Sequence, residues 1–289
     1  MIPAAFDYHA PGSLAEAIEL LGRYGDAKVL SGGQSLLPLL KLRLGSAGHL
    51  IDINRVPGLE YIKEEGGFLK IGGRTRESAL EGSELIHEKY PILADTAAVI
   101  ADPIVRNLAT IGGNLAHGDP ANDHPATMLA LGAVVVATGK KGERTIPIES
   151  FFTGLFETAL GKDEILTEIR IPAAQGKTSG AYVKLERKVG DFATAGAAVQ
   201  LTLGGGGEIT RAGIGLTNAG LVPLKVSAAE KFLQGKKPDA AAIAEAARLA
   251  AGAADPQADR RGAVEYKKEM ARVLTVRALK KAAERAQGA

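Results

Sequence analysis

The sequence contains no cysteine. Without thiolates the chain cannot ligate an iron–sulfur cluster, and it can hold neither a cysteine-ligated zinc ion nor a dithiol redox pair. If this chain takes part in redox chemistry, an organic cofactor must therefore carry the electrons. Any metal centres that work with it must lie on other chains.

The sequence also lacks a strong charge imbalance and a long apolar run. Its 289 residues carry a formal net charge of +2, which argues against nucleic acid as the main partner. No apolar run approaches the roughly 18 residues that a membrane-spanning helix needs. The N-terminal residues show neither the basic nor the apolar region of a signal peptide. We therefore expect a cytoplasmic protein, with two or three lobes at this length.

Two familiar phosphate-binding motifs are absent or incomplete. The sequence has no G-x-x-x-x-G-K-[ST] motif, which argues against a P-loop NTPase. The stretch Gly213–Asn218 begins like a dinucleotide-binding fingerprint, but it lacks the third glycine and occurs late in the chain. A phosphate-containing ligand would need a different kind of site.

Two segments with paired glycines offer such a site. Ser31–Leu36 reads SGGQSL, and Thr110–Leu115 reads TIGGNL. Glycine lets backbone N–H groups approach a ligand and adopts left-handed conformations without strain, and successive N–H groups can form an anion-binding nest. Each pair alone is also typical of a turn. Together, the segments suggest one ligand with two phosphates, or with a phosphate and a ring, held between two lobes.

The surroundings of the two segments refine this hypothesis. An apolar helix is expected over 35–44, so that its N-terminus faces the first segment and favours a phosphate there. The second segment is expected to be neither helix nor strand, because paired glycines weaken both. Neither segment contains lysine or arginine. Backbone dipoles are therefore expected to provide most of the phosphate binding.

The two segments and their spacing, with Asp123 after the second, resemble the flavin subunit of the molybdenum hydroxylases. The likeness is greatest to the medium chain of the carbon monoxide dehydrogenase and xanthine dehydrogenase family, and it runs from Phe6 to the C-terminal helices. It implies non-covalently bound FAD. It also implies an iron–sulfur small subunit and a molybdenum-cofactor large subunit as partners, in a dimer of heterotrimers.

The resemblance also implies roles for individual residues. Asp123 would bind a ribityl or ribose hydroxyl, Lys184 would place positive charge near the flavin N1–C2=O region, and Phe192 would cover the ring. From the residues alone, Lys184 is better interpreted as a surface lysine on an alternating strand, and Phe192 can be interpreted as a core residue. No catalytic residue is predicted. The predicted cofactor-binding residues are Val29, Leu30, Ser31, Gly32, Gly33, Gln34, Ser35, Leu36, Ala109, Thr110, Ile111, Gly112, Gly113, Asn114, Leu115, Asp123, Leu166, Lys184 and Phe192.

Four metal-ligating side chains also occur close together in sequence, at His117, Asp119, Asp123 and His124. Glycine and proline interrupt this stretch, so the side chains need not converge, and we predict no metal site. The two histidines are also candidates for covalent flavin attachment. The resemblance favours non-covalent binding instead.

The predicted fold is α+β. A two-lobed FAD-binding domain of the type found in p-cresol methylhydroxylase-like flavoproteins is expected over 1–175, with lobes near 1–55 and 56–175. A flexible stretch at 173–177 leads to a C-terminal antiparallel sheet with packed helices over 176–289. Three alternating strands are expected at 180–187, 195–203 and 208–217, with the four glycines Gly204–Gly207 as a turn.

Two functions remain open from the sequence. One is an electron-transfer flavoprotein subunit that passes electrons from the iron–sulfur clusters of a partner, through FAD, to an external acceptor. The alternative is a nucleotide-binding assembly or docking subunit with no redox role of its own. A yellow protein that releases FAD on heating favours the first function. A colourless protein that binds a nucleotide favours the second.

Overall fold

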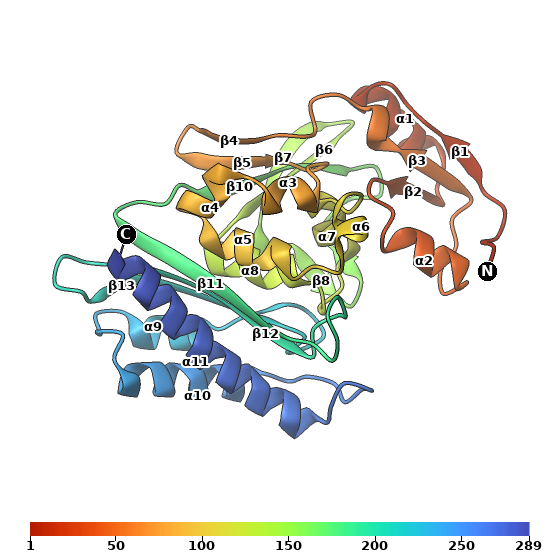
Figure 1. Ribbon diagram of the computed structural model, residues 1–289. Coiled ribbons are helices and arrows are strands. Elements are labelled where there is room, and N and C mark those ends of the chain that lie inside the picture. Colours follow the sequence, from red (N-terminus) through yellow and green to blue (C-terminus); the bar gives the residue numbers. More distant parts are fainter. Residues whose placement is uncertain (289) are drawn as a thin grey trace.

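The computed structural model describes residues 1–288 and contains three main β-sheets, which follow one another along the chain (Figure 1). Each sheet carries its own helices. Within the described residues, no helix is both long and apolar enough to span a membrane. The predicted α+β architecture is confirmed, since the strands do not join into one continuous parallel sheet.

The first sheet has three parallel strands in the order β1-β3-β2. Helix α1 begins as its capping sequence predicts, because the Ser13 hydroxyl accepts a hydrogen bond from the Glu16 N–H at 3.2 Å. Helix α2 is shorter than predicted. The elements are β1 (Asp7–His9), α1 (Leu14–Arg23), β2 (Ala27–Leu30), α2 (Leu36–Lys41), β3 (His49–Asp52) and the 3-10 helix η1 (Ile53–Arg55).

The second sheet has five antiparallel strands in the order β4-β5-β10-β6-β7, and the helices α3 to α8 lie between β5 and β6 in the chain. A short hairpin, β8–β9, lies between β7 and β10 in the chain, where β9 contacts α7. The strands are β4 (Ile62–Glu65), β5 (Phe68–Gly72), β6 (Val134–Gly139), β7 (Gly142–Pro147), β8 (Phe152–Gly154), β9 (Glu157–Thr158) and β10 (Ile165–Pro172). The helices are α3 (Glu77–Glu81), α4 (Glu84–Lys89), α5 (Pro91–Ala98), α6 (Pro103–Arg106), α7 (Ile111–His117) and α8 (Asp123–Leu131), with η2 (Ile148–Ser150) after β7.

The C-terminal sheet lies between two sets of helices (Figure 1). Helices α5 and α8 of the preceding lobe cover one face, and α9, α10 and α11 cover the other. The turn predicted at Gly204–Gly207 is present, with the Gly204 N–H bonded to the Glu208 carbonyl at 2.8 Å. The elements are β11 (Lys177–Leu185), β12 (Ala195–Leu203), β13 (Ile209–Thr217), β14 (Leu224–Lys225), α9 (Ser227–Leu233), α10 (Ala240–Ala253) and α11 (Val264–Gly288).

Close packing explains the glycines that resemble an incomplete dinucleotide fingerprint. Gly213 and Gly215 lie on β13 directly under α8, and a Cβ atom at either position would overlap a backbone carbonyl of that helix. These glycines allow the helix to approach the sheet. Ion pairs also join the second lobe to the C-terminal helices. The Asp95 carboxylate on α5 lies 3.0 Å from the Lys281 ammonium and 2.7 Å from the Arg285 guanidinium on α11.

The second glycine segment differs from its prediction. Residues 111–117 form helix α7, and both glycines lie in its first turn. The N-cap residue Thr110 accepts a hydrogen bond from the Gly113 N–H at 3.3 Å, which offsets part of the cost of glycine in a helix. Helix α3 begins after the N-cap residue Arg76, and the hydroxyl of the preceding Thr75 donates to the Tyr61 carbonyl at 3.0 Å.

Candidate cofactor site

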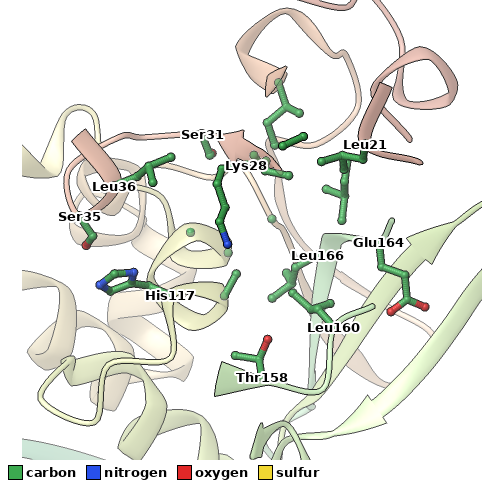
Figure 2. Close-up of a pocket in the computed structure, with 18 of the residues that line it drawn as sticks. Leu21, Lys28, Ser31, Ser35, Leu36, His117, Thr158, Leu160, Glu164 and Leu166 are labelled. Carbon is green, nitrogen blue, oxygen red and sulfur yellow. The ribbon is translucent and has the colours of Figure 1, made fainter. Parts of the chain in front are cut away.

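A cleft of about 840 Å³ opens between the first lobe and the second (Figure 2). One wall is formed by β2 and the segment Ser31–Leu36. The other is formed by α7, the β8–β9 hairpin and the start of β10. The volume falls in the range of small-molecule sites, roughly 300–1,000 Å³.

The first glycine segment presents a row of free backbone donors to the cleft. Within the described residues, the N–H groups of 32–36 have no hydrogen-bond partner, and Ser35 gives α2 no side-chain cap. Gly33 has φ 73°, which only glycine adopts without strain. Successive free N–H groups at the start of a helix favour an anion. This segment therefore has the local structure predicted for a phosphate site.

The second segment is built differently. The Ile111 N–H donates to the Thr75 carbonyl at 3.1 Å, and the Gly112 N–H donates to the Gly73 carbonyl at 3.0 Å. Gly112 allows this close approach, because a Cβ there would overlap Gly73. Neither Gly112 nor Gly113 has a positive φ. The predicted nest of open amides is therefore wrong for this segment, where the glycines mainly allow backbone packing.

A hydrogen bond brings the two segments together across the lobes. The Ser31 and Thr110 hydroxyls lie 3.0 Å apart, although the residues are 79 positions apart in sequence. Gly32 also packs against the carbonyl of Leu108, just before Thr110. Next to this contact, the Asn114 Oδ1 atom is buried and has no hydrogen-bond partner within the described residues. It is an acceptor that a ligand hydroxyl or N–H group can satisfy.

Most of the predicted cofactor-binding residues line this cleft. They are Val29, Ser31, Gly32, Gly33, Gln34, Ser35, Leu36, Ala109, Thr110, Gly112, Gly113, Asn114 and Leu166. The predicted residues that do not line it are Leu30, Ile111, Leu115, Asp123, Lys184 and Phe192. Ile111 and Leu115 are fully buried on the core side of α7, so their side chains stabilise the helix.

Asp123 and Lys184 meet in a buried polar cluster between α8 and the C-terminal sheet. Asp123 accepts hydrogen bonds from the Tyr182 hydroxyl at 2.6 Å and from the Lys184 ammonium at 3.0 Å. The Tyr182 oxygen also lies 3.0 Å from that of Thr217, and Lys184 donates to the Val99 carbonyl at 2.9 Å. Burial raises the pKa of the Asp123 carboxyl, and the Lys184 charge opposes that shift. The cluster joins the second lobe to the C-terminal sheet.

Replacing Asp123 by alanine should therefore destabilise the fold. The change leaves the Lys184 ammonium, only 3% exposed, with Glu186 at 3.3 Å as its remaining carboxylate partner. Removing one member of a buried ion pair costs about 3–5 kcal/mol, and Glu186 should keep the loss near the lower figure. Urea unfolding measures it, with Asp123→Asn as the isosteric control. Unchanged stability with lost cofactor would instead make Asp123 a cofactor ligand.

Lys28, His117 and Phe156 are among the lining residues that the predicted set of cofactor-binding residues did not include. Lys28, on β2, is exposed, forms no ion pair within the described residues and extends into the cavity (Figure 2). His117 is the last residue of α7, and Phe156 lies at the tip of the β8–β9 hairpin with φ 57°. Lys28 alternates with apolar neighbours on β2. This pattern could have indicated that its side chain points away from the core. No comparable signal pointed to Phe156.

Phe192 lies on the loop between β11 and β12, where its ring is 45% exposed. Its neighbour Asp191 anchors that loop by ion pairs with Arg261 at 2.7 Å and Arg187 at 3.0 Å. The hydrogen bonds from these two arginines, of which that from Arg261 has the larger effect, lower the pKa of the Asp191 carboxyl to about 2. The C-terminal domain therefore fixes the position of the loop that carries Phe192. The contact of Phe192 with a flavin ring stays a prediction.

The four metal-ligating side chains near α7 do not converge. His124 is fully buried, and its Nε2 atom lies 2.7 Å from Oε2 of Glu77. The Asp123 carboxylate instead binds Tyr182 and Lys184. Throughout residues 1–288, no group of three or more histidine, aspartate or glutamate side chains is arranged to hold a metal ion.

The residues that line the cleft fit FAD. The free N–H groups of 32–36 and the Lys28 ammonium offer donors and positive charge to a diphosphate. The unpartnered Asn114 Oδ1 offers an acceptor to a hydroxyl or ring N–H. The lining also includes the aromatic side chains of Tyr24, in the first lobe, and Phe156, in the β8–β9 hairpin. A cofactor that combines a diphosphate with ring systems matches these donors, this acceptor and these aromatic groups.

Comparison with known proteins agrees with this assignment. Residues 4–174 match the family described as the FAD binding domain in molybdopterin dehydrogenase, and 180–282 match the CO dehydrogenase flavoprotein C-terminal domain. The chain is 46% identical to the carbon monoxide dehydrogenase medium chain of Hydrogenophaga pseudoflava, over 96% of this chain and 97% of that one. It is 38% identical to subunit alpha of the 6-hydroxypseudooxynicotine dehydrogenase complex of Paenarthrobacter nicotinovorans, over 99% of this chain and 97% of that one.

Two solved structures extend the likeness over the whole fold. Carbon monoxide dehydrogenase from Hydrogenophaga pseudoflava superposes with a TM-score of 0.96 at 48% identity, and 99% of each chain is covered. Quinoline 2-oxidoreductase from Pseudomonas putida 86 superposes with a TM-score of 0.92 at 33% identity, again over 99% of each chain. The resemblance inferred from the glycine segments is thereby confirmed. The chain belongs to the family of FAD-binding medium subunits of molybdenum-containing hydroxylases and dehydrogenases.

Proposed function

We propose that this chain receives electrons from the iron–sulfur clusters of a partner subunit and passes them through FAD to an external acceptor. The observation that carries the proposal is a cleft suited to FAD in a chain without a single cysteine. FAD exchanges single electrons with clusters and electron pairs with acceptors, so it can join the two. The clusters must be supplied by another chain.

The residues of this chain bind and orient the cofactor. The N–H groups of 32–36 and Lys28 hold the diphosphate, and the side-chain Oδ1 of Asn114 accepts a hydrogen bond from the cofactor. Asp123 and Lys184 support the site through the cluster with Tyr182. The residues that line the cleft form the proposed FAD site, together with Phe192 when its loop meets the ring. In this proposal 1–175 is the FAD-binding domain and 176–289 is a separate C-terminal domain.

The proposed assembly is a dimer of heterotrimers in the cytoplasm. Its other members are an iron–sulfur small subunit and a molybdenum-cofactor large subunit. The names of the relatives support this, since they are medium chains or single subunits of multi-chain dehydrogenases. In this assembly the flavin edge opens toward the iron–sulfur subunit, as electron tunnelling from a cluster requires.

Purification of the tagged chain from its native host tests the proposal. We expect three polypeptides in equal amounts, with iron, acid-labile sulfide, molybdenum and FAD, and a native mass of two heterotrimers. Reducing the iron–sulfur chain should bleach the flavin absorbance, and an added acceptor should restore it. A flavin that stays oxidised while the clusters are reduced would contradict the electron-transfer role and favour the assembly subunit.

A further inference from the structure

His117 lies in the cleft but has no role in the contacts described so far. It follows Asn114 by three positions on α7, so both side chains lie on one face of the helix. Both line the cleft. Figure 2 shows the imidazole directed toward the part of the cavity that Ser35 and Leu36 border. His117 therefore lies in the part of the cleft that the start of α2 borders.

The imidazole of His117 can form hydrogen bonds that the described part of the chain does not itself provide. Within residues 1–288, neither of its ring nitrogens has a hydrogen-bond partner. Its ring is held by Phe156, with ring centroids 5.2 Å apart and planes at 60°. Phe156 is in turn fixed by its N–H bond to the Gly118 carbonyl at 3.1 Å. A ring that is positioned by packing and has free nitrogens is well suited to contact a ligand.

The charges around His117 favour a gain of a proton when an anion enters. Burial lowers the pKa of the imidazole in the free chain, and Asp119 opposes that shift. Among the described residues, the other charged groups that line the cleft are Asp26 before β2, Lys28 on β2, Glu157 on the hairpin, and Lys162 and Glu164 before β10, and α2 contributes none there. A nearby anion stabilises the imidazolium. Among these side chains, only an imidazole ordinarily changes charge between pH 5 and 8.

We propose that His117 is a further residue of the cofactor site, which hydrogen bonds the anionic cofactor and takes up one proton from solvent as the cofactor binds. This inference rests on the proposed FAD function. It adds a second positive charge to that of Lys28 opposite a diphosphate. The bound chain then holds one more proton than the free chain, so affinity must fall as pH rises.

The test is the pH dependence of FAD affinity in the full-length, deflavinated chain. Titration from pH 5.5 to 8.5, followed by flavin fluorescence, should show the Kd of the wild type rising by up to about tenfold per pH unit over part of the range. His117→Gln should flatten this dependence and lose most affinity at the acid end. His87→Gln is the matched control, since His87 is exposed on α4 outside the cleft and bonds the Glu81 carbonyl.

Calorimetry in buffers of different ionisation enthalpy counts the protons independently of any variant. We expect uptake of up to one proton by the wild type and by His87→Gln, and close to none by His117→Gln. Equal pH dependence in His117→Gln and the wild type, or no proton uptake by the wild type, would overturn the role of His117 and leave FAD binding intact. Failure of the wild type to bind FAD at every pH would overturn the proposed function itself.

Discussion

Replacing Gly33 by valine should remove FAD from a chain that still folds. Gly33 has φ 73°, a conformation that is strongly disfavoured for a β-branched residue. The new Cβ would also lie 3.0 Å from Leu37 Cδ1 and 3.1 Å from Leu30 Cδ1. The segment must shift, and the N–H groups of 32–36 move with it. Losing two charge-assisted hydrogen bonds of roughly 1.5–3 kcal/mol each weakens binding by about two to four decades.

Gly58→Val is the matched control for this experiment. Gly58 has φ 77° and nothing within 4 Å of its Cβ position, and it does not line the cleft. Both variants carry similar backbone strain, so both should lose a similar amount of stability. Only Gly33→Val should lose FAD, as the FAD-to-protein ratio and the melting temperature measured side by side will show. Full flavin occupancy in folded Gly33→Val would remove the first segment from the site.

Reversing the charge of Lys28 should have the next largest effect. Its ammonium extends into the cleft and forms no ion pair within the described residues, so a glutamate there repels a diphosphate without breaking an internal contact. We expect Lys28→Glu to raise the FAD Kd by about 100-fold or more, and Lys28→Met by about tenfold, with little change in unfolding free energy. The loss should diminish with added salt, because salt screens the repulsion.

Lys231→Glu, on the exposed side of α9, controls for the change in net charge. It should bind FAD as the wild type does at every salt concentration. If Lys28→Glu also binds as the wild type does, backbone dipoles alone hold the diphosphate, as the composition of the glycine segments first suggested.

The glycine segments show how far sequence reasoning reaches. Sequence spacing and the family resemblance placed Ser31 and Thr110 at one site, and their hydroxyls lie 3.0 Å apart. The same reasoning assigned all four glycines to ligand binding. In the structure, Gly112 packs on Gly73 and Gly32 packs on Leu108. Such contacts join residues far apart in sequence, so no local pattern reveals them.

The charged residues show where sequence reasoning is weaker. Lys28 was overlooked because the search for phosphate ligands was confined to the two glycine segments, although it precedes the first by only a few residues. Asp123 and Lys184 were assigned to the cofactor, which stays a prediction, and the structure shows that they also bind each other and Tyr182 at a buried junction. A sequence can indicate that a charged residue has a specific role. It does not show which group the fold places next to that residue. The alternating strands of the C-terminal sheet, which depend on local pattern, were predicted within a few residues.

The most direct test of the central claim is the binding of FAD to the isolated full-length chain after removal of any flavin. We expect saturation at one FAD per chain. At 100 times the Kd, FAD should add about 2.7 kcal/mol to the free energy of unfolding, which corresponds to a rise of roughly 5–10 °C in melting temperature for a chain of this size. A folded chain that neither binds FAD at a stoichiometry of one nor gains stability from it would contradict the assignment of this cleft.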